Sequence, residues 1–581
     1  MSAVLLGDSN LRDEDNRIGK ILDFFAVEWR AAALPAVHTD VSEDGLASRP
    51  IRLLGSAQVF CELLEQLEHS PQLRKWWSER VHSAFVYAAR DSGALQLLLR
   101  RLTTCAPISK RTTQDKEFAV TEEWNEFCAA MSGVRTRLPP ESITPSMVLD
   151  TTEGGLPIIS SAQGAAFIML EYHGVRIFLS TSEEIVDLDS AIQVGNFDIR
   201  DYFLAAVPLV LYVNWAFKGE SWKTPEIGAC VIIDDPLIRP RYGFINFRKL
   251  VGLINHHRIT ASLAFIPWNW RRTDPNTARL FRDGARMSLS VHGCDHTRRE
   301  FGTSDSQVVA SKVKRAVERM ESHETRSGIK FDRVMVFPQG VFSECSISVL
   351  KQYNFLAAIN TGMISSDAEP RTIRLRDLWE PALMAYGEFP IFSRRSPAAG
   401  LENFAFDMLL GKPCLIVTHH DFFGDGCRRF VDFVAGLKAI NCPLVWRSPA
   451  ALVRRTFRQR ELSSGEIEAE MFTRELIIEN HFDRRTRYLI KKRESCSSRV
   501  SSVWHDAEHL EWTYSDGYVR FSVELEPKQT TTVSIDLHEG SREVASESQW
   551  AERAKVALRR LLSEARDNYY HPIRAWSPFR K

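Results

Sequence analysis

The heptapeptide Ala229-Cys-Val-Ile-Ile-Asp-Asp235 is a short β-branched apolar run that ends in two adjacent carboxylates. It predicts a buried strand whose last residues reach the edge of a sheet. The same unit, an apolar strand closed by polar residues and followed by a helical stretch, recurs at 259–266 before Pro267-Trp268-Asn269, at 287–291 before His292, at 333–337 before Pro338 and at 414–418 before His419. Strands alternating with helices predict a parallel sheet or β/α barrel, in which chemistry gathers at the C-terminal ends of the strands.

The regions on either side of this unit have different patterns. Residues 1–220 alternate helical spacing, as at 57–67, with strand patterns, as at 83–89, and predict an N-terminal α/β domain to which the sequence assigns no role. Residues 221–455 are expected to form the barrel. Residues 456–541 contain short alternating strands with a turn at Ser515-Asp516-Gly517 and predict a small antiparallel β-sandwich, and residues 542–581 a C-terminal helix and tail. We therefore expect a multidomain α/β protein.

Composition excludes several classes of function. The 581 residues are enough for roughly three domains. The 74 basic and 74 acidic residues cancel, so no nucleic-acid partner is expected. The longest apolar stretch, 202–217, is too short to span a bilayer. Ten scattered cysteines without a CxxC motif, and a charged N-terminal region, predict a cytoplasmic protein with reduced thiols. The sequence carries no signal for an oligomeric state.

Three clusters at the predicted strand ends could carry chemistry: Asp234-Asp235, the pair His292 and His296, and His419-His420-Asp421. Carboxylate and imidazole are the ligands of catalytic zinc. With 16 histidines, chance alone gives about 0.4 pairs at a spacing of four, so the pair means little by itself. His505 and His509 have the same spacing without an upstream Asp-Asp, and we assign them to the surface. The convergence of the clusters predicts a site for Zn²⁺ or another divalent metal.

With these motifs in this order, residues 225–455 resemble the polysaccharide deacetylase family, the NodB-type carbohydrate esterases of family 4, which are built on a distorted β/α barrel. The resemblance implies that Asp234 is the general base, that His419 is the acid, and that the metal is held by Asp235, His292 and His296. Pro338-Gln339-Gly340 resembles the proline–glycine loop of the family, so we expect Pro338 and Gly340 to lie at the substrate.

The sequence departs from the family pattern at two points. The family commonly has an arginine just before the proline of this loop, paired with the base, and here Phe337 takes its place. Either Arg394 or Arg395 is an alternative partner. The doubled His419-His420 leaves two candidate acids; we prefer His419, because it directly follows the strand, and expect His420 to point to the other face. Asp421 could orient the acid or serve as a cap.

The resemblance implies hydrolysis of a C–N amide bond. The metal would lower the pKa of water from 15.7 to about 7, Asp234 would take the proton, and the histidine acid would protonate the leaving amine. The expected substrate is an N-acylated sugar or a related amide, with Trp268 as a possible apolar platform for a sugar ring. Two alternatives remain: a catalytically inactive barrel that serves as a carbohydrate-binding or assembly module, and a glycoside hydrolase, for which the adjacent Asp234 and Asp235 are poorly arranged.

Overall fold

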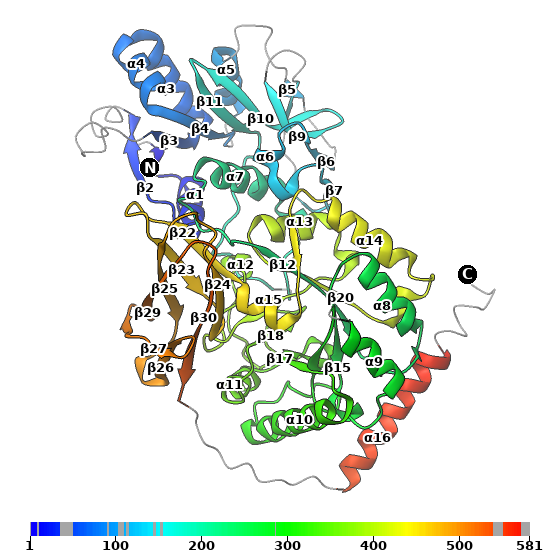
Figure 1. Cartoon of the computed structure of the whole chain (residues 1–581). Coiled ribbons are helices and arrows are strands. Elements are labelled where there is room, and N and C mark those ends of the chain that lie inside the picture. The colour runs from blue at the N-terminus through cyan, green and yellow to red at the C-terminus, as the bar shows by residue number, and fades with distance from the viewer. Residues whose placement is uncertain are drawn as a thin grey trace, which may run out of the picture.

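The computed structural model describes residues 2–7, 11–34, 50–89, 92–102, 110–111, 116–142, 147–150, 155–193, 195–284, 286–538 and 550–570. Figure 1 shows an N-terminal α/β unit above a central barrel, with a β-sandwich beside the barrel and helix α16 (Trp550–Ala565) at the opposite edge. Within the described residues, no helix combines the length and the apolar composition needed to cross a membrane.

The N-terminal unit is built on a mixed sheet whose main path has the order β2-β1-β3-β4-β11-β10-β9-β6-β7. Its outer strands are β2 (Trp29–Ala33) at one end and β9 (Leu156–Ser161), β6 (Glu117–Val120) and β7 (Arg135–Arg137) at the other. Strands β1 (Ser2–Gly7), β3 (Ile51–Ser56) and β4 (Val81–Tyr87) run parallel, whereas β10 (Gly164–Tyr172) and β11 (Val175–Ser180) form an antiparallel hairpin. Helix α3 (Ala57–His69) begins where the Ser56 side chain accepts the Val59 N–H, which satisfies an otherwise unpaired donor. The strand predicted at 83–89 and the helix predicted at 57–67 are confirmed.

The central sheet is parallel and has the order β19-β18-β17-β16-β15-β12-β20, with β21 (Leu444–Trp446) also paired to β12. Its strands are β12 (Ile227–Asp234), β15 (Ala261–Phe265), β16 (Met287–His292), β17 (Phe331–Val336), β18 (Ala357–Asn360), β19 (Ile391–Ser393) and β20 (Cys414–Thr418). The five strands predicted from the repeating unit are all present. Because β12 is buried along most of its length, it reads as a continuous apolar run.

A single parallel bridge brings the two ends of the central sheet together. Arg395, two residues after β19, pairs with Ile416 of β20, and the Arg395 backbone both donates to the Leu415 carbonyl and accepts from the Val417 N–H at 2.9 Å. This bridge nearly closes the sheet into a barrel. The C-terminal ends of all its strands therefore open on one mouth.

Helices cover the outside of the barrel. The longest of them, α10 (Ser306–Ser327), starts at the Asp305 cap and ends at Gly328, whose φ of 70° lies in the left-handed region that suits glycine. The largest apolar cluster continues from α1 (Asp13–Phe24) through the buried helix α7 (Phe203–Ala216) into the barrel. The N-terminal unit and the barrel thus share apolar packing.

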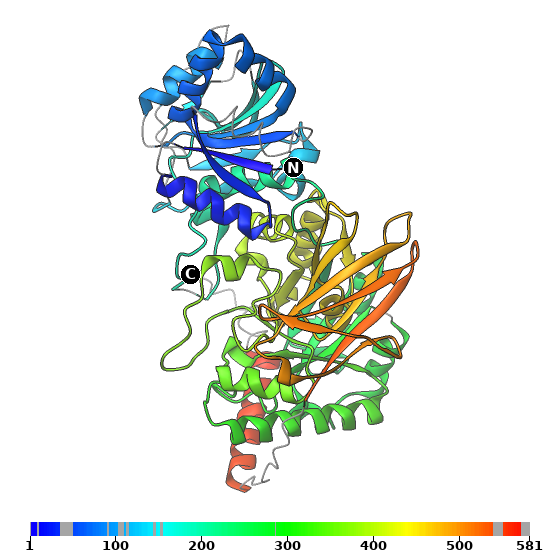
Figure 2. The same cartoon turned by 90° about the vertical axis from the view of Figure 1, so that its left-hand side faces the viewer.

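The C-terminal β region consists of two sheets, β22-β23-β25-β29-β28 and β24-β30-β26-β27, which enclose one apolar cluster. The first sheet includes β22 (Phe457–Glu461), β28 (Thr513–Ser515) and β29 (Tyr518–Leu525). The second includes β26 (Val500–His505), β27 (Glu508–His509) and β30 (Thr530–Leu537). Figure 2 shows the strands of this sandwich in front of the barrel. The prediction of a purely antiparallel sandwich is wrong at one pair, since β23 (Ile467–Met471) and β25 (Thr486–Arg493) run parallel. The intervening β24 (Glu475–Glu479) crosses to the other sheet, so β23 and β25 are not joined by a hairpin.

Candidate metal and catalytic site

The two adjacent aspartates after β12 separate because the chain turns sharply between them. Asp234 is the last residue of the strand and is buried, whereas Asp235 has a φ of 78°, in the left-handed region. A non-glycine residue with this φ is uncommon and costs free energy, so the surrounding structure must hold it in place. His292 is the last residue of β16, two strands away. The mouth of the barrel thereby gathers side chains that are far apart in the sequence.

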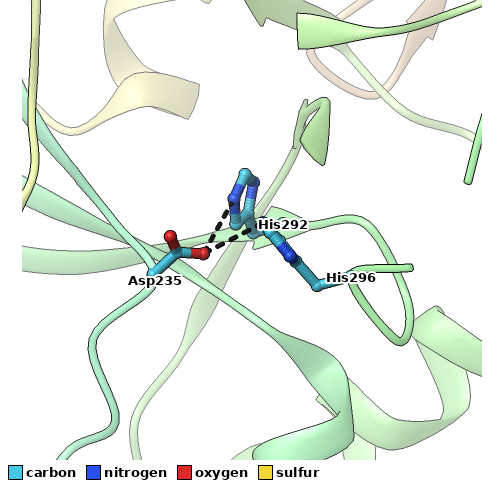
Figure 3. A group of neighbouring side chains, drawn as sticks. All are labelled: Asp235, His292 and His296. Atoms are coloured by element: carbon cyan, nitrogen blue, oxygen red, sulfur yellow. Dashed lines mark ion pairs between the residues drawn. The ribbon is translucent and has the colours of Figure 1, made fainter. Parts of the chain in front are cut away.

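Asp235, His292 and His296 converge on one point, as Figure 3 shows. The Asp235 Oδ1 lies 3.4 Å from the His292 Nε2 and 3.0 Å from the His296 Nε2. Two ligands bound tetrahedrally at about 2.0–2.1 Å from zinc are about 3.3 Å apart, so these separations suit a shared cation. The Asp235 Oδ1 is buried, and the described residues give it no hydrogen-bond donor. One carboxylate and two imidazoles therefore fit a divalent metal and leave coordination positions for water or substrate.

The first histidine of the pair is held in a fixed orientation. The His292 Nδ1 lies 2.9 Å from the carbonyl oxygen of Val336 on β17, and the ring is almost fully buried. With Nδ1–H donating to a carbonyl, Nε2 is free to face the cation, which is the usual support for a metal-bound histidine. Burial lowers the pKa of His292, but the carboxylates of Asp234 and Asp235 outweigh burial and raise it.

The loop between the two histidines is organised by a buried carboxylate. Glu300 accepts the backbone N–H groups of Cys294 at 3.1 Å, Asp295 at 2.9 Å and His296 at 3.0 Å. Successive N–H groups that point at one anion form a nest. The close approach needs glycine at 293, which has a φ of 64° and where a Cβ would lie 2.4 Å from Pro338 and 2.5 Å from the Glu300 Oε2. Glu300 thus sets the shape of the loop that presents His296.

The first aspartate of the motif, Asp234, pairs with an arginine that directly follows β19. The Arg394 Nη1 and Nη2 donate to the two carboxylate oxygens of Asp234, both at 2.7 Å, and both side chains are buried. Burial raises the pKa of Asp234, but the Arg394 guanidinium outweighs burial and holds the pKa below its ordinary value. Asp235 behaves similarly: burial raises its pKa, but His296 and His292 hold it well below the usual range.

Phe337, at the position where the deacetylase family commonly has an arginine, is a core residue in this structure. Phe337 is fully buried and stacks on Phe342 with 5.3 Å between ring centroids. Of the two alternatives, Arg394 lies against Asp234, whereas Arg395 faces the other way and binds Asp407 through two hydrogen bonds, of 2.6 and 3.1 Å. Successive side chains of an extended segment point to opposite faces, which explains the division. Arg394 is therefore the partner of Asp234, and the alternatives that give Arg395 to the base or to the substrate are wrong, because its guanidinium is buried in the pair with Asp407.

The adjacent side chains of His419 and His420 also point in different directions. His419 is half-exposed, and its Nε2 lies 4.0 Å from the Asp234 Oδ2. His420 is buried, stacks on Phe244, and lies 3.7 Å from the Asp567 carboxylate of the C-terminal segment. Asp421 is exposed, and the described residues give its carboxylate neither a histidine nor another partner. His419 is thus the histidine that faces Asp234, and His420 points to the other face, as the sequence predicted.

The remaining predicted residues lie around the mouth. Pro338 is buried against Gly293 of the metal loop, and the carbonyl of Gly340 accepts a hydrogen bond of 2.9 Å from Asn360. Trp268 is partly exposed and donates its backbone N–H to the Cys294 carbonyl, while the Arg272 guanidinium lies 5.2 Å from its ring centroid. Pro338 and Trp268 thus pack on the metal loop from two sides.

Sequence reasoning missed two carboxylates at the mouth. Glu300 stands four residues after His296, so the extended spacing of His292, His296 and Glu300 is a signal that could have been read. No spacing in the sequence indicates Asp567, because it comes from the far end of the chain and reaches Tyr242 and His420 only in the folded structure.

No protein-family model matches the sequence. No curated protein matches it. Among solved structures, a family 4 carbohydrate esterase (CE4) pseudoenzyme from Bacillus anthracis aligns with 38% of this chain and 63% of its own, at 9% identity and a TM-score of 0.25. A family 4 carbohydrate esterase from Streptomyces lividans aligns with 38% of this chain and 92% of its own, at 14% identity and a TM-score of 0.24. A peptidoglycan N-acetylglucosamine deacetylase aligns with 40% of this chain and 93% of its own, at 14% identity and a TM-score of 0.25. The chain thus spans less than two thirds of the pseudoenzyme it matches.

Proposed function

We propose that this protein is a metal-dependent hydrolase that removes an acyl group, such as acetyl, from the amide nitrogen of an N-acylated sugar or a related amide. The observation that carries the proposal is the convergence of Asp235, His292 and His296 within 4.8 Å of one another, directly beside the buried Asp234–Arg394 pair. A cation site next to an ionised carboxylate suits hydrolysis of an amide, because it combines an electrophile with a base.

Each residue has a role in this proposal that follows from its surroundings. A divalent metal held by Asp235, His292 and His296 would act as a Lewis acid and make water a better nucleophile. Asp234 takes the proton from the attacking water, and Arg394 keeps Asp234 ionised and oriented for this step. His419, half-exposed and 4.0 Å from Asp234, delivers a proton to the leaving amine. A cytoplasmic location remains a prediction from the sequence.

The alternative of an inactive binding or assembly module was motivated by the missing arginine at Phe337 and by the large flanking domains. The bidentate contact of Arg394 with Asp234 supplies a guanidinium to the same carboxylate from the segment that follows β19. The first of these two features is therefore compensated, and we retain the hydrolase as the proposal.

Metal content and turnover, measured separately, test the proposal. Purified protein should hold about one divalent ion by elemental analysis and release acetate from N-acetylglucosamine oligomers. His292→Ala should lose the ion and the activity, and Asp234→Asn should keep the ion and lose the activity. His505→Ala is the matched control, since His505 lies in the β-sandwich on β26 (Val500–His505) and should change neither property. A wild-type protein that holds the ion but hydrolyses no N-acyl sugar would refute the enzymatic proposal.

A further inference from the structure

Helix α16 contacts the barrel through its polar side. Glu564 binds the Arg272 guanidinium with two hydrogen bonds, one of them 2.8 Å between Oε2 and Nη2. Just beyond the helix, the Asp567 Oδ2 accepts the Tyr242 hydroxyl at 2.9 Å, and the Asn568 Oδ1 accepts the Gly243 N–H at 2.8 Å. These barrel residues stand on the segments that follow β12 and β15. The helix is therefore anchored beside the mouth of the candidate site.

The opposite side of the same helix is apolar and faces solvent. Leu558, Leu561 and Leu562 are 61%, 54% and 62% exposed, and their spacing places them in one stripe. A surface helix normally buries its apolar stripe and exposes its polar side. This helix buries Val556 and Arg560 and leaves the three leucines exposed. Figure 1 shows α16 at the edge of the molecule.

Basic side chains border the leucine stripe. Lys555 is exposed and Arg559 partly exposed on one flank of the helix. Arg566, just beyond the helix, is exposed and donates to the Asp567 Oδ1 at 2.9 Å. The acidic side chains nearby point inward, since Glu564 pairs with Arg272 and Asp567 is buried. The sequence from 569 to 581 adds Arg574, Arg580, Lys581 and four aromatic residues, with no Asp or Glu. The local charge is therefore positive although the whole chain is neutral.

We propose that the leucine stripe of α16 with its basic flank is a docking surface for an anionic lipid membrane. Leucines that enter the headgroup region, flanked by lysine and arginine, are the features of a helix that lies in a membrane interface. A second copy of this chain fits the stripe less well. An antiparallel pair of these helices would bring Lys555 of one copy near Arg566 of the other, and like charges repel.

Docking on a membrane would also orient the molecule. Because Glu564 and Asp567 fix the helix to Arg272 and Tyr242, the mouth of the candidate site would be held close to the lipid surface. The inference goes beyond the proposed hydrolase and does not rest on it, since vesicle binding is measured without turnover.

Flotation of the full-length protein with lipid vesicles tests the inference. We expect binding to vesicles of phosphatidylcholine with phosphatidylglycerol, weaker binding to pure phosphatidylcholine, and loss of binding as salt rises, because the attraction to anionic lipid is screened. Leu561→Glu with Leu562→Glu should weaken binding to the anionic vesicles at least tenfold. The matched control is Leu97→Glu with Val308→Glu, at two exposed apolar side chains away from α16, and should bind like wild type.

Two results would overturn the inference. The first is equal binding, or none, to anionic and neutral vesicles by a folded wild-type protein. The second is self-association measured by light scattering that the Leu561→Glu, Leu562→Glu variant abolishes, which would assign the stripe to a second copy. Circular dichroism and metal content of this variant establish that it is folded.

Discussion

The guanidinium of Arg394 and the carboxylate of Asp234 form a bidentate pair in the interior, with both hydrogen bonds at 2.7 Å. The two residues are 160 positions apart in the sequence. Such a pair fixes both the charge and the direction of the aspartate. It leaves Asp234 ionised at the mouth of the barrel, next to the candidate metal site, and it makes the arginine as important to the proposed chemistry as the aspartate.

Replacing Arg394 by Ala should raise the pKa of Asp234, because burial then acts without the opposing guanidinium. The acid limb of the pH profile of kcat/KM should move up by about one to three pH units. Stability should fall by about 3–5 kcal/mol, since a buried charge loses its partner. Arg394→Ala combined with Asp234→Ala should recover part of that stability in urea unfolding. An unmoved acid limb in an active Arg394→Ala protein would contradict the assignment of Asp234 as the base.

Glu300→Gln should weaken metal binding without removing a ligand. The glutamine NH₂ group would face one of the three backbone N–H groups that the carboxylate now accepts, so the loop carrying His296 should shift. Changes of this kind typically cost about 10–100-fold in metal affinity. Competition with a chelator measures the effect. Glu344→Gln, at the partly exposed first residue of α11 (Glu344–Gln352), is the control and should leave the affinity unchanged. Wild-type affinity in folded Glu300→Gln would show that the nest does not position the ligand.

His419→Gln and His420→Gln should differ in their effect on catalysis. His419 lies near Asp234 and has access to solvent, so its loss should lower kcat by about 10²–10⁴-fold with little change in metal content. His420 is buried between Phe244 and Asp567, so its replacement should mainly lower the melting temperature. Comparing kcat and melting temperature for the two variants checks the division. The reverse pattern would assign the acid to His420.

His323 predicts an acid-sensitive fold. Burial is the main cause that lowers the pKa of His323 to about 4, and the positive charge of Arg326 lowers it further. The His323 ring forms a hydrogen bond of 2.8 Å with the Thr273 hydroxyl. The unfolded chain takes up a proton at this histidine below about pH 6.5, whereas the native protein does so only below about pH 4. The free energy of unfolding should therefore fall as pH drops from 6.5 to 4, by on the order of 3 kcal/mol.

Urea unfolding at pH 7.5 and 4.5 measures this effect. His323→Gln should lose that part of the pH dependence, because glutamine does not titrate. His173→Gln, at the exposed turn between β10 and β11, is the control and should keep the wild-type slope. An unchanged slope in His323→Gln would show that other groups produce the acid sensitivity.

Local patterns in the sequence determined much of the barrel. Strands such as 229–233 and 414–418 could be predicted because a buried parallel strand needs an uninterrupted β-branched run, and a polar residue ends it where the strand meets solvent. The C-terminal sandwich was predicted from alternation, but the parallel pairing of β23 and β25 was not. The alternation of apolar and polar residues indicates which face of a strand is buried, but it does not indicate which strand lies beside it.

The identity of the residues at the site was also largely determined by the sequence, since Asp234, Asp235, His292, His296 and His419 all follow predicted strands. Only the tertiary structure decided which arginine meets Asp234, which histidine faces it, and that Glu300 and Asp567 belong to the mouth. The physical reason is the separation along the sequence over which each effect acts. Strand propensity and burial act between near neighbours in the sequence, whereas a hydrogen bond or an ion pair depends on where closure of the barrel places two side chains in space.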